Sequence, residues 1–151
     1  MTETVAYIEP NGSEGTMQNA ESLALLMSEI DDLFEQKRYA EVIRAVYGVE
    51  SQFIQSIDDN QLSALEVIKG FSQMCLEQLD EAMISFELGL NLNPESSQAC
   101  VGLGEIFYLR SKDENAKLMY GWAVKLDEDN VGARRGLDKV NAALAAARVA
   151  V

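Results

Sequence analysis

The chain has 151 residues, of which 48% are hydrophobic and 25% are charged, a composition ordinary for a soluble globular protein of one domain. Its formal net charge of −13 at pH 7 speaks against nucleic acid and anionic membranes as partners, because both would be repelled. No apolar run approaches the ~20 residues that a membrane-spanning helix needs, and two cysteines are too few for a disulfide framework.

Residues 1–17 are rich in Gly, Glu, Ser and Thr, which predicts a flexible N-terminal arm. Residues 4–10 carry strand-favouring Val, Tyr and Ile, so this stretch is either disordered or extended in a groove of the same or a neighbouring molecule. The N-terminus has no basic n-region and no apolar h-region. We therefore expect a cytoplasmic protein.

From Gln18 onward, apolar residues recur at spacings of three and four, which is typical of amphipathic helices. One such set is Leu118, Trp122, Val124 and Leu126. Turn-like sequences interrupt the pattern at Lys37-Arg38, Ile57–Gln61, Gln78, Asn93-Pro94, Ser111–Asp113 and Asp127–Asn130. These breaks predict an all-α fold of about seven antiparallel helices joined by short turns. Ser63 and Glu66 fit the capping-box pattern at one helix start.

The predicted helices repeat with a period of about 34 residues, because several residues at this spacing are alike. The pairs are Gly70 and Gly104, Met74 and Tyr108, Ala82 and Ala116, Phe86 and Tyr120, Gly89 and Ala123, and Leu92 and Leu126. Glycine in a helix interior costs about 1 kcal/mol against alanine. We therefore expect Ala82 and Gly89 to be small because neighbouring helices approach each other there.

A helix–turn–helix period of about 34 residues is that of the tetratricopeptide repeat, with the pattern W-x2-L-G-x2-Y…A-x3-F…P. The chain resembles this pattern at Gly70, Ala82, Phe86 and Pro94, and again at Leu103, Gly104, Phe107, Ala116, Tyr120 and Ala123. The resemblance implies an antiparallel helix-pair solenoid over residues 18–151. It would hold two to three units, at about 23–58, 63–94 and 97–130, with a C-terminal capping helix at about 131–147.

The first unit matches the pattern less well than the other two. Residues 39–43 resemble the start of a second helix, but large residues such as Val42 replace the small ones. The spacing from Tyr39 to Leu79 is six more than the period. We therefore predict an extended helix through residues 49–57.

Residues suited to catalysis or metal binding are scarce. The chain has no histidine, which is the usual general base and metal ligand, and no Walker, Gly-x-Gly-x-x-Gly or Gly-x-Ser-x-Gly motif. Residues 127–138 resemble a calcium loop, but Val131 and Arg135 stand where oxygen ligands are needed. An acid-rich helix cap explains the same residues. We expect no enzyme activity, no cofactor and no metal site.

In tetratricopeptide stacks, the first helix of each unit lines a concave groove where family members usually bind peptides or helices. The resemblance therefore assigns partner-binding residues by their place in the repeat. They are Met27, Asp31 and Phe34 from the first unit; Ala64, Val67, Phe71 and Met74 from the second; Gln98, Val101, Glu105 and Tyr108 from the third; and Arg135 and Lys139 from the cap. Alternatively, several of the apolar ones belong to the core between helices or are covered by the arm.

Chaperone-binding members of the family hold a terminal carboxylate with a clamp of lysine and asparagine. The residues at those places here are Val67, Phe71, Val101 and Glu105. The resemblance therefore speaks against a receptor for C-terminal carboxylates. An apolar groove with acidic flanks favours an amphipathic or basic-apolar segment.

Three functions fit these features. The leading hypothesis is a non-catalytic protein–protein interaction module that binds a peptide or amphipathic helix in the groove. The second is a small acidic secretion-type chaperone for a translocated partner, similar to the three-repeat chaperones of type III translocators. The third is an accessory unit of a separate enzyme, such as a glycosyltransferase.

Charge is unevenly distributed along the chain. Residues 1–109 carry a net charge of −15, whereas residues 110–151 carry +2. This acidity either only keeps the chain soluble or favours a basic or amphipathic protein partner. A homo-oligomer is also compatible with the sequence.

Overall fold

A computed structural model describes residues 12–150 of the chain. Within this range there are seven α-helices and no strands. In chain order they are α1 (Gly12–Glu35), α2 (Tyr39–Phe53), α3 (Asp59–Cys75), α4 (Leu79–Leu92), α5 (Ser97–Leu109), α6 (Asp113–Leu126) and α7 (Val131–Val149). The predicted all-α class is confirmed. None of these seven helices is both long and apolar enough to cross a membrane.

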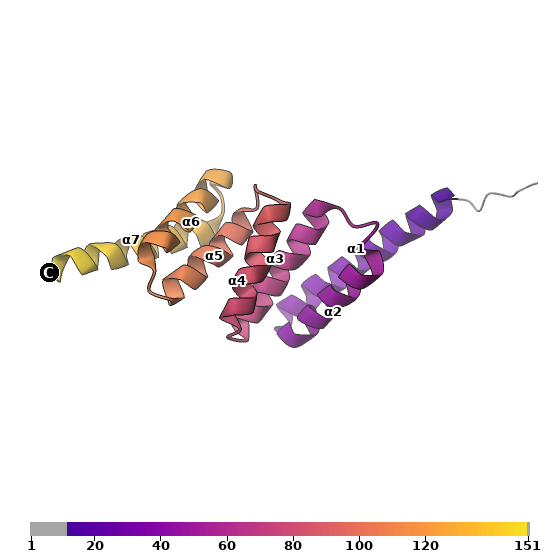
Figure 1. Ribbon diagram of the computed structural model, residues 1–151, viewed down its shortest axis with the longest axis horizontal. Helices are drawn as coiled ribbons and strands as arrows, with labels where there is room; N and C mark the ends of the chain where they lie inside the picture. The colour runs from indigo at the N-terminus through magenta and orange to yellow at the C-terminus, as the bar shows by residue number, and fades with distance from the viewer. Residues whose placement is uncertain (1–11, 151) are drawn as a thin grey trace, which may run out of the picture.

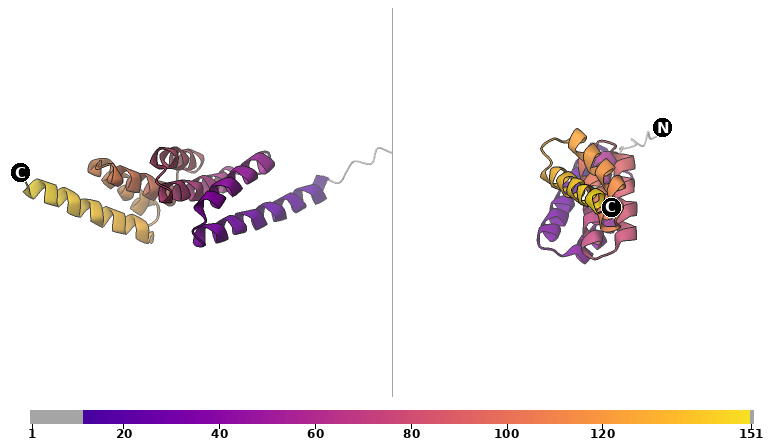
Figure 2. Two further views of the ribbon diagram at one scale, coloured as in Figure 1. Left: turned by 90° about the horizontal axis from the view of Figure 1, so that it is seen from below. Right: turned by 90° about the vertical axis from the view of Figure 1, so that its left-hand side faces the viewer.

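Successive helices pack as antiparallel pairs, α1 with α2, α3 with α4 and α5 with α6, and α7 closes the stack (Figure 1). The helix α3 also contacts α1 and α5, and α5 contacts α7, so the odd-numbered helices follow one another along one side. The left view of Figure 2 shows α1 and α7 on this side and α4 on the other. The molecule is therefore the helix-pair solenoid that the repeat predicts.

The turns inside the three helix pairs share one backbone geometry. Each has a residue with positive φ just after the first helix, namely Lys37 (59°), Glu77 (61°) and Ser111 (54°). The next N–H group then bonds the carbonyl five residues earlier, as Gln78 N does to Gln73 O at 2.9 Å. Because the first pair has this same turn, α1 and α2 form a unit like the other two.

The six additional residues between the first and second units lie elsewhere than predicted. The helix α2 ends at Phe53 and has 15 residues against 14 in α4, so no extended helix runs through residues 49–57. In contrast, α3 has 17 residues against 13 in α5. Most of the insertion is therefore an additional first turn of α3, and the prediction of an extended second helix is wrong.

The start of α3 explains this additional turn. Asp58 accepts a hydrogen bond from Gln61 N (2.8 Å), and the Gln61 side chain accepts one from Asp58 N (3.1 Å), which completes a capping box. The predicted box of Ser63 and Glu66 does not form. Ser63 is buried and donates instead to Gly89 O of α4 at 2.7 Å.

The first helix begins at Gly12, six residues before the predicted start at Gln18. Residues 12–17 are therefore helical and do not belong to a flexible arm as predicted. Residues 4–10, for which docking or disorder is predicted, lie outside the described residues.

Buried aromatic rings sit against glycines of the neighbouring helices. Phe86 of α4 has no exposed surface, and a Cβ placed on Gly70 of α3 or on Gly102 of α5 would lie 2.8 Å or 2.4 Å from its Cε1. Tyr120 of α6 lies in the same way between the equivalent glycines one period further along, the second of which is Gly136 of α7. The repeat geometry therefore continues into α7, which caps the stack as predicted.

Small residues do stand where helices approach each other. Ala82 and Ala116 have no exposed surface. A Cβ placed on Gly89 would lie 3.1 Å from Val67 Cγ2 and 3.4 Å from Ser63 O. The close contact between helices explains why residues of low helix propensity or small volume occur inside α4.

Candidate functional site

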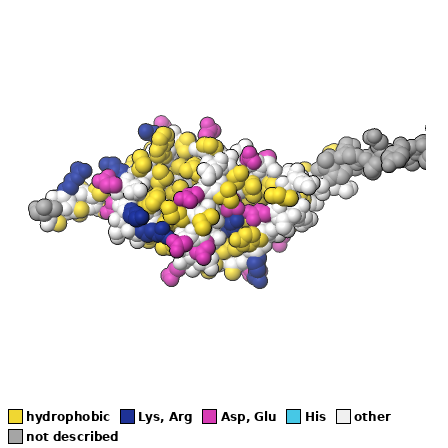
Figure 3. Space-filling view, viewed as in Figure 1, with side chains coloured by type: hydrophobic (Ala, Val, Ile, Leu, Met, Phe, Trp, Pro, Cys, Tyr) yellow, Lys and Arg dark blue, Asp and Glu magenta, His cyan; other side chains and the backbone are white. Residues whose placement is uncertain are grey.

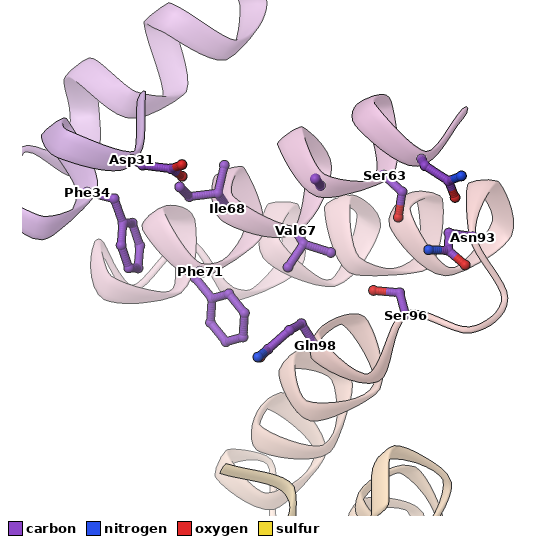
Figure 4. A pocket seen from close by; sticks show the side chains of 11 residues that line it. Asp31, Phe34, Ser63, Val67, Ile68, Phe71, Asn93, Ser96 and Gln98 are labelled. Atoms are coloured by element: carbon purple, nitrogen blue, oxygen red, sulfur yellow. The ribbon is translucent and has the colours of Figure 1, made fainter. Parts of the chain in front are cut away.

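A pocket of about 500 Å³ opens on the side of the stack formed by the odd-numbered helices (Figure 4). Its lining comes from α1, α3, α5 and the turn between α4 and α5, and we call it the α1–α3–α5 pocket. The lining residues are Asp31, Phe34, Asn60, Ser63, Ala64, Val67, Ile68, Phe71, Asn93, Ser96 and Gln98. Residues distant in the sequence meet here because the first helices of successive units lie side by side.

Apolar side chains of α1 and α3 form the body of the pocket. The Phe34 ring meets Tyr39 edge to face at 5.6 Å between centroids, and Phe71 meets Phe86 at 4.8 Å. Both phenylalanines are partly buried, and Val67 is only 9% exposed. Each ring is therefore held by the core on one side and offers its remaining surface to the pocket.

Side-chain amides provide the available polar groups. Asn60 and Gln98 are exposed, and Figure 4 shows Gln98 pointing across the pocket toward Phe71. The two hydroxyls already have partners: Ser96 accepts a hydrogen bond at the start of α5 (3.2 Å), and Ser63 donates to a backbone carbonyl of α4 (2.7 Å). The amides of Asn60 and Gln98 are thus the uncharged polar groups open to a ligand.

Asp31 is the one ionisable side chain among the lining residues, and it is exposed. No lysine or arginine lines the pocket. An anionic ligand would therefore meet only a like charge there, whereas a cationic group could pair with Asp31.

A second group of predicted residues forms a polar cluster on α5 and α7. Lys139 Nζ lies 3.0 Å and 3.1 Å from the two carboxylate oxygens of Glu105, and the Tyr120 hydroxyl also donates to Glu105. The same Nζ lies 4.2 Å from the centroid of the Tyr108 ring. Burial, with the Glu105 hydrogen bond, raises the pKa of Tyr120, so its hydroxyl stays protonated and donating. The charge of Glu105 is thereby compensated within the protein.

The structure separates the predicted partner-binding residues into groups. The pocket brings together Asp31, Phe34, Ala64, Val67, Phe71 and Gln98. The polar cluster contains Glu105, Tyr108 and Lys139. Three apolar residues pack against the hydrophobic core, namely Met27, Met74 and Val101. Arg135 is exposed on α7. The pocket therefore contains six of the predicted residues, and the polar cluster contains three others.

Five lining residues were not predicted: Asn60, Ser63, Ile68, Asn93 and Ser96. Asn60 lies in the additional first turn of α3, which a strictly regular repeat does not contain. Asn93 and Ser96 lie in the turn between two units. The sequence indicates a helix break at Asn93-Pro94, but a break does not identify which side chains of the turn line a pocket.

The residues that resemble a calcium loop form a turn and a helix cap. Asp127 accepts a hydrogen bond from Asp129 N (3.0 Å), and Asn130 accepts one from Ala133 N (3.0 Å) at the start of α7. Between residues 12 and 150, no three His, Cys, Asp or Glu side chains gather closely enough to hold a metal ion.

Several solved domains have a closely similar backbone. The first tetratricopeptide repeat domain of Spaghetti (RPAP3), bound to the HSP90 peptide SRMEEVD, matches with a TM-score of 0.72 and 22% identity, over 83% of this chain and 97% of that one. The domain of Sgt2 from Aspergillus fumigatus matches with 0.72 and 19%, over 84% and 82%. The second domain of human RPAP3, in complex with the HSP70 peptide SGPTIEEVD, matches with 0.66 and 16%, over 83% and 98%. No family model and no curated protein sequence matches the chain.

Proposed function

Because the chain has the tetratricopeptide repeat fold, we propose that it is a non-catalytic protein–protein interaction module. Its ligand is a peptide segment or an amphipathic helix, held in the α1–α3–α5 pocket. The supporting observation is that partly buried aromatic rings and exposed amides share one pocket of about 500 Å³. Apolar walls with a few polar groups are typical of ligand sites of this size.

The proposed ligand carries an apolar anchor with a basic flank. The rings of Phe34 and Phe71 receive the anchor, because burying their remaining surface stabilises the complex. Asp31 pairs with a lysine or arginine of the ligand. The amides of Asn60 and Gln98 can bond the ligand backbone.

This ligand differs in charge from the peptides bound to the RPAP3 domains, both of which end in acidic residues. The pocket here offers no cation to a terminal carboxylate, and the whole chain carries −13. A secretion-type chaperone or an accessory enzyme unit would use the same pocket, and no described feature favours either of these narrower functions.

The proposal can be tested with three fluorescently labelled peptides and the full chain. Two peptides share one apolar sequence and carry either lysine or glutamate flanks, and the third is SRMEEVD. We expect anisotropy titrations to show binding of the lysine-flanked peptide. The glutamate-flanked peptide should bind about tenfold more weakly or worse, and SRMEEVD should not bind measurably.

Matched variants show whether the pocket is the site. Asp31→Lys should weaken binding of the lysine-flanked peptide, whereas Asp32→Lys, the same charge change outside the pocket lining, should not. Phe71→Ala should weaken it, and Leu25→Ala, on an exposed part of α1, should have no effect. Equal binding of both flanked peptides, or unchanged binding by the two pocket variants, would contradict the proposal.

A further inference from the structure

The helix α6 presents exposed apolar side chains that the packing of the repeat does not use. Leu118 is 58% exposed and Trp122 is 49% exposed. A depression of about 280 Å³ lies beside them and is lined only by residues of α6, namely Glu114, Lys117, Leu118, Gly121, Trp122 and Lys125. A Cβ placed on Gly121 would meet no atom within 4 Å, so the space above this glycine is unoccupied by other parts of the protein.

These residues form one seam along the helix. Glu114, Leu118, Gly121 and Lys125 follow each other at spacings of four, three and four residues, and we call this row the α6 seam. Such spacing is typical of a helix face that packs against another helix. The opposite face of α6 is already occupied, because Ala116, Tyr120 and Ala123 are fully buried.

The helix α4 also exposes large apolar side chains. Ile84 (65% exposed) and Leu88 (41% exposed) occupy the equivalent places on α4, one period before Leu118 and Trp122. Figure 3 shows hydrophobic side chains gathered on this face of the molecule. Large apolar side chains that gather on one exposed face are typical of a protein–protein contact.

We propose that the α6 seam binds the α6 seam of a second copy of this chain, in antiparallel orientation across a two-fold axis. The seam has an acid at its N-terminal end and a base at its C-terminal end. Antiparallel pairing therefore places Glu114 of each copy opposite Lys125 of the other. In the same register, Leu118 of each copy faces Gly121 of the other, whose missing side chain lets the helices approach closely, and Trp122 lies next to this contact.

Charge favours this occupant and this orientation. Parallel pairing would oppose Glu114 to Glu114 and Lys125 to Lys125, so the seam complements itself only when antiparallel. Neither residue forms an ion pair among residues 12–150, although Lys125 Nζ lies 5.0 Å from the Trp122 ring centroid. Elsewhere two copies would repel, because residues 1–109 carry −15 whereas residues 110–151 carry +2.

The first test is the association state of the full chain. Sedimentation velocity over a range of micromolar concentrations should show a monomer–dimer equilibrium. Trp122 is the single tryptophan, so its fluorescence should shift to shorter wavelength as the dimer forms. A chain that stays monomeric throughout, or a dimer whose tryptophan emission is unchanged from the monomer, would overturn the proposal and leave the face to another protein.

A charge-swap series tests the register. Glu114→Lys and Lys125→Glu should each weaken the dimer about tenfold or more, because each places like charges opposite one another. The double variant should restore it, and an equal mixture of the two single variants should form a heterodimer. If only the overall charge mattered, Glu114→Lys would strengthen association, because it reduces the magnitude of the net charge from −13 to −11.

Glu35→Lys on α1 makes the same charge change as Glu114→Lys, outside both the seam and the exposed apolar side chains of α4 and α6, and serves as the control. It should leave the dimer intact or slightly strengthen it. Circular dichroism should show the same helix content in every variant, because all these side chains are exposed. A Glu114→Lys variant that dimerises as well as wild type, or a mixture that fails to associate, would contradict the antiparallel seam.

Discussion

The ring of Phe86 lies so close to the backbone of Gly102 that a Cβ at position 102 would be 2.4 Å from Phe86 Cε1. The same relationship recurs one period on, where a Cβ on Gly136 would be 2.1 Å from Tyr120 Cε1. In both cases the ring belongs to the second helix of one unit and the glycine to the helix that follows. These contacts join the second unit to the third, and the third unit to the capping helix α7.

Gly102→Ala and Gly136→Ala should each reduce the free energy of unfolding by roughly 1–3 kcal/mol, because the added methyl group overlaps a buried ring. Gly48→Ala is the matched control. A Cβ there meets no atom within 4 Å, so this change should stabilise the chain by about 0.5–1 kcal/mol. Urea unfolding measures all three, and stabilisation by Gly102→Ala would show that the ring moves aside freely.

Ala82→Leu and Ala116→Leu should each destabilise the chain by roughly 1–3 kcal/mol, since both alanines are fully buried between paired helices. Ala40→Leu, at an exposed position of α2, provides a control of equal size and should change stability by less than about 0.5 kcal/mol. Unchanged urea midpoints for both buried positions would contradict the contact at these alanines.

Glu66 should make the stability depend on pH. Burial, together with a hydrogen bond to Glu50, raises the pKa of Glu66 to about 7, although Lys69 Nζ lies 2.6 Å away and opposes this shift. In the unfolded chain the pKa of Glu is about 4.3. Between these two pKa values, Glu66 is therefore protonated in the folded chain and ionised in the unfolded chain. Its stabilising effect is complete below about pH 4.3 and is lost as the pH rises through about 7.

We accordingly expect the free energy of unfolding to fall by roughly 1–3 kcal/mol between about pH 5 and about pH 8. Glu66→Gln should flatten this dependence, because glutamine does not titrate. The slope is the readout, since the variant also leaves Lys69 without its nearest carboxylate. Glu87→Gln, at an exposed position, should keep the wild-type slope, and an equally steep slope in Glu66→Gln would refute the assignment.

Glu77→Gly should stabilise the chain. The φ angle of Glu77 is 61°, a conformation that costs a non-glycine residue about 1–2 kcal/mol. Glycine avoids this cost but loses about 0.5–1 kcal/mol more in conformational entropy on folding. The net gain should be about 0.5–1 kcal/mol, visible as a higher thermal midpoint. Glu81→Gly, within α4, should lower the midpoint instead.

Phe71→Ala combined with Tyr108→Ala should abolish capture of the lysine-flanked peptide while leaving the helix content unchanged, because both rings are partly exposed. The single variants distinguish the pocket from the polar cluster. Loss of peptide binding in Phe71→Ala but not in Tyr108→Ala would locate the ligand in the pocket. Ala64→Arg provides a second route, since it fills the pocket without removing the Phe71–Phe86 contact. A peptide that binds all these variants normally must lie elsewhere.

The sequence by itself predicted the helices, their pairing and the period of the repeat. These features are local or periodic. Apolar spacing identifies each helix, and glycines one period apart, such as Gly70 and Gly104, identify equivalent positions in successive units. It also located Asp31, Phe34, Val67, Phe71 and Gln98 on one side of the molecule, since the first helices of successive repeats share a face.

Only the tertiary structure decided where the additional residues lie, which of the predicted groove residues share the pocket and which apolar side chains remain exposed. The capping box at Asp58 places the start of α3 one turn earlier. Lys139 of α7 pairs with Glu105 of α5. Leu118 and Trp122 have the spacing of a buried face, yet both are exposed. Periodicity reports that a helix has an apolar face, but whether that face is covered depends on which helix packs beside it, and that is a property of the assembled stack.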